Sequence, residues 1–178
     1  MLRKTVLLSG LALLALSSFP ASSQAQENPF QIALIGPTIQ LVDDDADIKG
    51  LRLNLLYGVN QNVYGLDWGL INHTRGNQKA WQIGLVGLAQ GSFVGWQDNF
   101  VNLSPGDFLG LQTGFVNHAG KGEGFQWGGV NHAANFRGLQ LALVNFAEDM
   151  YGLQIGLINI IQSKNNFPIL PLVNWKMD

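Results

Sequence analysis

The stretch GLQLALVN at residues 138–145 returns fourteen residues later as GLQIGLIN at residues 152–159. Related octapeptides start at residues 50 (GLRLNLLY), 65 (GLDWGLIN), 80 (AWQIGLVG), 95 (GWQDNFVN), 110 (GLQTGFVN) and 124 (GFQWGGVN). Neighbouring copies are therefore 14 or 15 residues apart, and degenerate copies at Gly36 (GPTIQLVD) and residue 167 (FPILPLVN) extend the series to about ten units. A period this regular predicts an array of structural units that pack on their neighbours.

Within a unit, large apolar residues mostly occupy the second, fourth and sixth positions, and glycine or a polar residue occupies the others. This alternation has a period of two, which predicts one β-strand per unit, and the asparagine that ends most units favours a turn. The fold class is therefore all-β. The structural positions of the repeat are Gly65, Gly110, Gly138, Gly152, Gln82, Gln97, Gln112, Gln126, Gln140, Gln154, Asn72, Asn102, Asn117, Asn131, Asn145 and Asn159.

Glycine weakens a strand unless backbone curvature or close approach requires it, so the face that carries glycine and glutamine is expected to be crowded or strongly curved. Two architectures fit. One is a small antiparallel up-and-down β-barrel of about ten strands, with glycine and glutamine inside and the apolar residues facing lipid. The other is a β-solenoid with 14–15 residues per coil, with the apolar residues inside and glutamine and asparagine stacked as ladders.

The volume of the aromatic side chains favours the barrel. A coil this short encloses a core only about 10 Å across, which Trp68, Trp81, Trp96 and Trp127 would overfill. The same residues exposed to water would form a very large apolar patch, whereas lipid would cover them. Two features support the solenoid instead: the connections between units have similar lengths, and Asp98 places a carboxylate in an apolar position.

The N-terminal residues 1–25 have the features of a secretory signal peptide: basic Arg3 and Lys4, an apolar run, and a small-residue site that ends at Ala25. Residues 26–49 are expected to form an opening strand and an acidic loop, in one domain with the repeats of residues 50–178. The chain has no cysteine, which excludes disulfides. Without Arg3 and Lys4, eight basic and twelve acidic residues remain, so nucleic acid is not an expected partner.

The units resemble the bacterial surface-repeat proteins, exported envelope proteins built on Gly-Leu-Gln-x-Gly-Leu-Val-Asn copies. The resemblance extends from about Pro29 to the C-terminus and is carried by residues 49–72 and 167–175 as well as by the octapeptides. It implies a location in the cell envelope and no activity. A weaker resemblance to curli-type subunits rests on Gln-x-Gly-x-x-Asn-x-Ala at residues 112–119 and 126–133, but the spacing from asparagine to the next glutamine is longer here.

Few residues suggest chemistry. His73, His118 and His132 follow the asparagine of their units, where a turn that tolerates histidine is the favoured explanation, although the last two could share a metal ion. The acidic run Asp43–Asp47 could bind calcium, although a solvated loop explains it as well. Residues 120–124 (GKGEG) lack the spacing of a phosphate-binding loop. Arg52 and Asp67 share a position in adjacent units and could pair inside a barrel, whereas in the solenoid they would form an exposed pair.

The sequence therefore predicts a protein without catalysis, cofactor or metal, because it contains no HExxH or GxSxG motif. We expect an exported structural or interaction protein of the cell envelope, located in the outer membrane or at the cell surface. The favoured form is a narrow outer-membrane barrel in contact with lipid. The alternative is a secreted or surface-displayed solenoid that binds or adheres through a glutamine and asparagine face, and self-association is open in either case.

Overall fold

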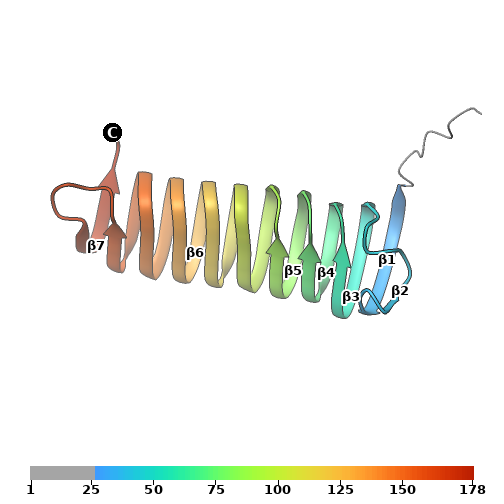
Figure 1. Cartoon of the computed structure of the whole chain (residues 1–178). Coiled ribbons are helices and arrows are strands. Elements are labelled where there is room, and N and C mark those ends of the chain that lie inside the picture. Colours follow the sequence, from blue (N-terminus) through green and yellow to red (C-terminus); the bar gives the residue numbers. More distant parts are fainter. Residues whose placement is uncertain (1–26) are drawn as a thin grey trace, which may run out of the picture.

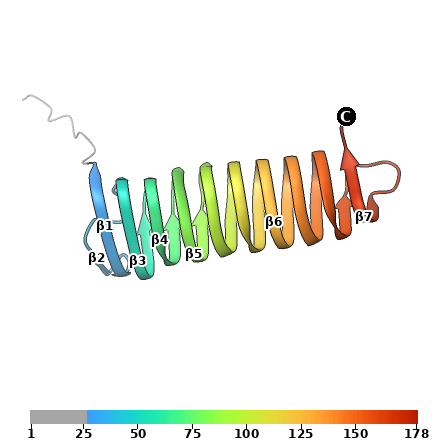
Figure 2. The same ribbon diagram turned by 180° about the vertical axis from the view of Figure 1, so that it is seen from behind.

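The computed structural model describes residues 27–178, so the predicted signal peptide lies outside the described residues. The chain winds as one elongated coil from its N-terminal to its C-terminal end (Figures 1 and 2). Its strands are β1 (Asn28–Ile35), β2 (Ile39–Gln40), β3 (Ile48–Asn60), β4 (Val63–Thr74), β5 (Gln78–Ala89), β6 (Phe93–Ile161) and β7 (Ile169–Lys176). In this part of the chain there is no helix with the length and apolar character that crossing a membrane requires.

The barrel prediction is wrong, because successive repeats pair in parallel. Gly50 lies beside Gly65, Gly65 beside Ala80, and Ala80 beside Gly95, so each residue neighbours its counterpart in the next unit. An up-and-down barrel requires antiparallel neighbours. Each repeat is instead one coil of a β-solenoid, and β6 continues through coil after coil without a break. We use the word column for the residues at one position of successive units.

The inside of the solenoid also differs from the predicted alternative. The glutamine and asparagine columns are fully buried, whereas Trp68, Trp127 and Leu157 are 58–63% exposed. The expectation that glutamine lies inside and large apolar residues outside is thus met, but in a solenoid and not in a barrel. The expectation that glycine lies inside is wrong, because most glycines of the first column, such as Gly65 and Gly110, are partly or fully exposed. A thin coil accommodates slender amide side chains that hydrogen-bond along its axis, and the indole rings do not need to fit inside.

Each coil turns at two corners. The first corner lies at the sixth column, where Leu70 and Leu85 drop out of the strand pairing and the sixth and seventh residues both point outward. The second corner is polar and consists of short links such as Arg75–Asn77 between β4 and β5. There the Asn62 side chain accepts a hydrogen bond from the backbone N–H of Asn77. The Asn77 side chain in turn accepts one from the backbone N–H of Ser92. The molecule is therefore a blade with two long edges.

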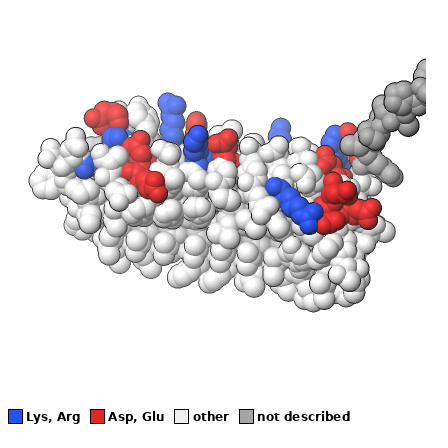
Figure 3. All heavy atoms as spheres, in the orientation of Figure 1, with Lys and Arg blue, Asp and Glu red and all other residues white. Residues whose placement is uncertain are grey.

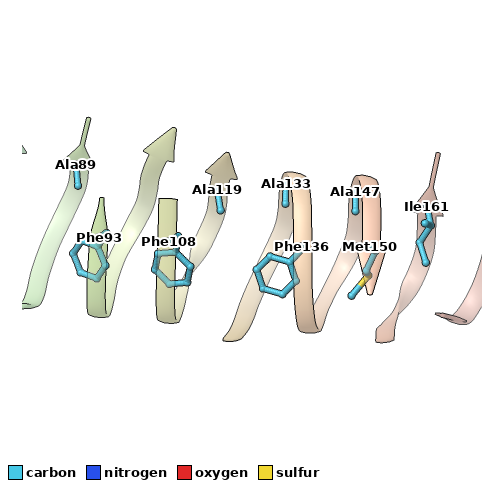
Figure 4. Packing of buried hydrophobic residues seen from close by; sticks show 9 residues of the cluster. All are labelled: Ala89, Phe93, Phe108, Ala119, Ala133, Phe136, Ala147, Met150 and Ile161. Atoms are coloured by element: carbon cyan, nitrogen blue, oxygen red, sulfur yellow. The ribbon is translucent and has the colours of Figure 1, made fainter. Parts of the chain in front are cut away.

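The other half of the interior is apolar and was not predicted from the sequence. It contains two facing rows of alanine and larger apolar side chains, shown in Figure 4: Ala89, Phe93, Phe108, Ala119, Ala133, Phe136, Ala147, Met150 and Ile161. Phe93, Phe108, Phe136 and Met150 each lie two residues before the first residue of a unit, so a signal for this row exists in the repeat. Gly122 takes this place between Phe108 and Phe136, and a Cβ there would lie 2.5 Å from the Phe136 ring.

The ends of the solenoid differ from the predicted first and last copies. The opening copy is β1 and not the stretch at Gly36, because Phe30 pairs with Leu51 and Gln31 with Arg52. The short strand β2 then pairs antiparallel with β1. At the other end, β7 runs antiparallel to the last coil, so the copy at residue 167 is a reversed cap and not a further coil.

Candidate functional site

The buried glutamines form one continuous hydrogen-bonded ladder. The Nε2 atom of each glutamine donates to Oε1 of the glutamine one coil earlier, from Gln154 to Gln140 (2.7 Å) and on through Gln126, Gln112, Gln97 and Gln82. A buried amide without partners costs about 1–3 kcal/mol, so this pairing is what allows a polar interior. At the C-terminal end of the ladder, the Gln154 Oε1 atom has no hydrogen-bond partner within residues 27–178.

Arg52 and Asp67 terminate the glutamine ladder at its N-terminal end. Gln82 Nε2 donates to Asp67 Oδ2 at 3.0 Å, and Arg52 binds both carboxylate oxygens of Asp67 at 2.7 Å each. Both side chains are fully buried. The expectation that a solenoid would expose this pair is therefore wrong. All ladder donors point toward the carboxylate, so the aligned amides and the negative charge stabilise each other.

The asparagine column forms a second ladder with the opposite direction. Asn102, Asn117, Asn131 and Asn145 each donate through Nδ2 to Oδ1 of the asparagine one coil later, at 2.8–2.9 Å. The same amides also donate to backbone carbonyls of the next coil, for example Asn117 to Trp127. The two ladders thus run antiparallel along the coil and hold its first corner from inside.

The glycines of the first column are required by close approach of the backbone. At Gly110 the φ angle is +139°, and a Cβ atom would lie 1.9 Å from the carbonyl oxygen of Gly95. Gly65, Gly138 and Gly152 have the same positive φ and the same contact with the preceding coil. Close approach between neighbouring coils therefore explains these glycines, and the crowding lies between backbones and not on a face shared with glutamine.

The first corner carries a long exposed surface of large apolar residues, which we call the apolar edge. It comprises the fourth column (Leu53, Trp68, Ile83, Trp127, Leu141, Ile155), the sixth column (Leu55, Leu70, Leu85, Phe100, Phe115, Leu143, Leu157) and the seventh column (Ile71, Val86, Val101, Val116, Val130, Val144, Ile158). Figure 3 shows lysine, arginine, aspartate and glutamate along the upper part of the blade, while its lower edge is uncharged. Apolar and charged residues are therefore segregated to opposite edges.

Rings stack along the exposed apolar columns. Phe100 and Phe115 have centroids 5.3 Å apart, and Trp81 and Trp96 of the second column have centroids 5.1 Å apart, and in both pairs the ring planes are nearly parallel. Between the fourth and sixth columns the small residues of the fifth column leave shallow hollows, such as the one lined by Trp127, Gly128, Leu141, Leu143, Ile155 and Leu157. The edge is thus ridged along the solenoid axis, with apolar walls.

Asp98 is the one charged residue in the columns of the apolar edge within residues 27–178, and it is half-buried. Its Oδ1 atom accepts a hydrogen bond from the Thr113 hydroxyl at 2.6 Å, and that hydroxyl accepts one from Trp96 Nε1 at 2.8 Å. The polar atoms of this short chain therefore satisfy one another, which lowers the penalty of placing a carboxylate among apolar side chains.

The three histidines lie in one column on the flank of the blade, and the structure brings two of them together. The Nδ1 atoms of His118 and His132 are 2.8 Å apart, and the His132 ring stacks on Phe146. Burial, and then the proximity of His132, lower the pKa of His118. Burial also lowers the pKa of His73, whose Nδ1 atom lies 2.8 Å from the Tyr57 hydroxyl.

The remaining candidate segments do not assemble a ligand site. Asp44 pairs with Arg75 at 2.5 Å, and Asp47 accepts a hydrogen bond from Asn62, so two carboxylates of the Asp43–Asp47 run have protein partners. Residues 120–124 lie within β6. In the described part of the chain, no group of three or more histidine, aspartate or glutamate side chains is placed to hold a metal ion.

No family model, curated protein or solved structure matches this chain. Its function must therefore be inferred from its own geometry.

Proposed function

We propose that this protein is an exported, non-catalytic interaction module that binds through its apolar edge. The observation that carries the proposal is the exposure of the sixth column, where Leu55, Phe100 and Leu143 are each 54–58% exposed. The largest apolar patch on a typical monomeric soluble protein is about 300–600 Å². The eight coils that begin at Gly50 to Gly152 extend roughly 38 Å at about 4.8 Å per strand, and three apolar columns follow this whole length, so the edge is comparable with that size.

The polar ladders are not the binding surface. The solenoid alternative derived from the sequence placed adhesion on a glutamine and asparagine face, but both ladders are fully buried. Their hydrogen bonds are made within the molecule, so they support the fold and present no amide rows to a partner. The resemblance to surface-repeat proteins and the signal peptide predicted at residues 1–25 support export to the cell envelope or surface.

The proposal is tested by comparing the native protein with a variant whose apolar edge is charged. Leu85→Lys/Leu143→Lys changes two exposed side chains of the sixth column. The control variant Asn135→Lys/Gln162→Lys, called the polar-edge variant, adds the same charge at exposed positions near the polar second corner. We expect the native protein and the polar-edge variant to be recovered from cells in assemblies larger than a monomer, and the apolar-edge variant as a free monomer. Recovery of all three as free monomers would contradict the proposal.

A further inference from the structure

We propose that the occupant of the apolar edge is the hydrocarbon of a lipid surface, into which the blade dips by its uncharged corner. This inference rests on the proposed function and names its partner. The interaction is peripheral: the first corner, which carries the apolar edge, enters one leaflet, and the polar second corner stays in water.

The shape of the apolar edge favours a fluid partner over a second copy. Apolar residues cover the sixth column at the corner and continue on both flanks, with the fourth column on one side and the seventh on the other. A rigid partner laid against one flank, such as another blade, would leave the opposite flank and the corner in water. Acyl chains can surround both flanks and fill the hollows above the small residues of the fifth column, such as Gly128 and Gly156.

The polarity changes with distance from the corner as a lipid interface requires. The sixth column contains leucine and phenylalanine, and the fourth column, two residues or about 7 Å away, includes Trp68 and Trp127. The position just before each unit then carries Lys49, Lys79 and Arg137 among its residues. Amphipathic proteins bury their apolar face about 5–10 Å into the boundary between headgroups and acyl chains, where tryptophan is enriched.

The charge distribution specifies the kind of lipid surface. Within residues 27–178 the columns of the apolar edge contain no basic residue, and Asp98 is their one acidic residue. Lys49, Lys79 and Arg137 lie six residues, or about 20 Å, from the corner, and their column also contains Glu123. Attraction to anionic lipid requires basic side chains close to the membrane surface. Binding should therefore depend on apolar contact, change little with salt, and occur on zwitterionic lipid.

The test uses flotation of the purified protein with vesicles of phosphatidylcholine alone and with vesicles that also contain phosphatidylglycerol. We expect the protein to float with both, with less than a twofold change in bound fraction between low and high salt. Leu85→Lys/Leu143→Lys should reduce binding at least tenfold, while Asn135→Lys/Gln162→Lys should bind as the native protein does. Circular dichroism and thermal melting check that both variants are folded.

A second measurement uses the protein's own tryptophans, because every tryptophan in the described chain lies on an exposed column or the C-terminal cap. Brominated phosphatidylcholine should quench the fluorescence of the native protein, and quenching should fall for Leu85→Lys/Leu143→Lys. Absence of both flotation and quenching would overturn the lipid assignment. If light scattering then shows that the native protein is a dimer and that Leu85→Lys/Leu143→Lys is a monomer, the occupant is a second copy and the proposed function survives. If the native protein is a monomer without vesicle binding, both fail.

Discussion

Single residues decide how the polar interior is tolerated. Asp67 replaces glutamine in the third column, and its carboxylate receives hydrogen bonds from Arg52, Gln82, Gln78 and Asn54. Arg52 in turn donates to the His73 carbonyl and the Thr74 hydroxyl. A buried ion pair contributes little net stability when it is replaced as a pair, but removal of one partner strands the other charge.

Asp67→Asn should therefore lower the free energy of unfolding by about 3–5 kcal/mol, because it leaves the Arg52 guanidinium buried without a counter-charge. The double variant Arg52→Gln/Asp67→Gln places the usual residue of the column at both positions and should recover most of that loss. Urea unfolding of native, single and double variants measures the difference. A double variant as unstable as Asp67→Asn would refute this account of the ladder end.

Glycine at the first column provides a second test at the residue scale. Gly110→Ala forces a side chain into a φ of +139° and against the Gly95 carbonyl, which should destabilise the protein by about 1–3 kcal/mol or more. Ala80 shows that alanine fits where the backbone avoids positive φ, so Ala80→Gly should cost no more than about 1 kcal/mol. Thermal melting of the two variants provides the comparison, and equal effects would argue against the close approach.

At the scale of the element, residues of one column depend on one another across coils more than residues within a single strand do. Glycine interrupts the asparagine column at Gly87 and at Gly58, which is the ninth residue of its unit and pairs with Asn72 because the register shifts there. Asparagine at the fifth position compensates at both sites. Asn54 donates to Asn72 Oδ1 and Asn99 donates to Asn102 Oδ1, both at 2.7 Å. A Cβ at Gly87 would lie 2.4 Å from the Asn99 amide nitrogen, so the two substitutions belong together.

The histidine column should make stability depend on pH. Because the pKa values of His118 and His73 are lowered by burial, the folded protein binds fewer protons than the unfolded chain near pH 6.5. The stability that these two histidines contribute is present above their pKa in the unfolded chain. It is lost as the pH falls toward their lower pKa in the folded protein. The free energy of unfolding should decrease between pH 7.5 and 5.5, and His118→Gln should flatten this dependence. An unchanged slope in that variant would exclude His118 as a source.

At the scale of the whole molecule, the ends of the coil decide between a monomer and a stack. Solenoid ends expose unpaired strand edges that can template pairing with another copy. Here β7 covers the last coil in antiparallel orientation and carries Pro171, and the two-residue β2 pairs with the outer strand β1. These caps oppose the end-to-end stacking that a weak likeness to curli subunits would suggest.

Removing residues 162–178 should therefore convert the protein into one that associates end to end. The deletion uncovers the β6 edge from Gly152 to Ile161, where the Gln154 Oε1 atom, which has no partner within residues 27–178, could accept a hydrogen bond from a second copy. Because β2 still pairs with β1 at the other end, sedimentation velocity should show dimers whose fraction rises with concentration, whereas removal of Met177 and Asp178 alone should leave a monomer. A monomeric deletion variant would show that β7 is not what limits stacking.

The sequence by itself determined the repeat period, the β-structure, the need for glycine, and the separation of slender polar from bulky apolar side chains. Alternation says which side chains share a face, but it is the same whether neighbouring strands run parallel or antiparallel, so closure as a barrel and winding as a solenoid could not be distinguished. Only the tertiary structure decided that, because a buried amide finds its partner 14 or 15 residues away only once coils stack in register. The same stacking buried Arg52 and Asp67 and left the apolar edge exposed.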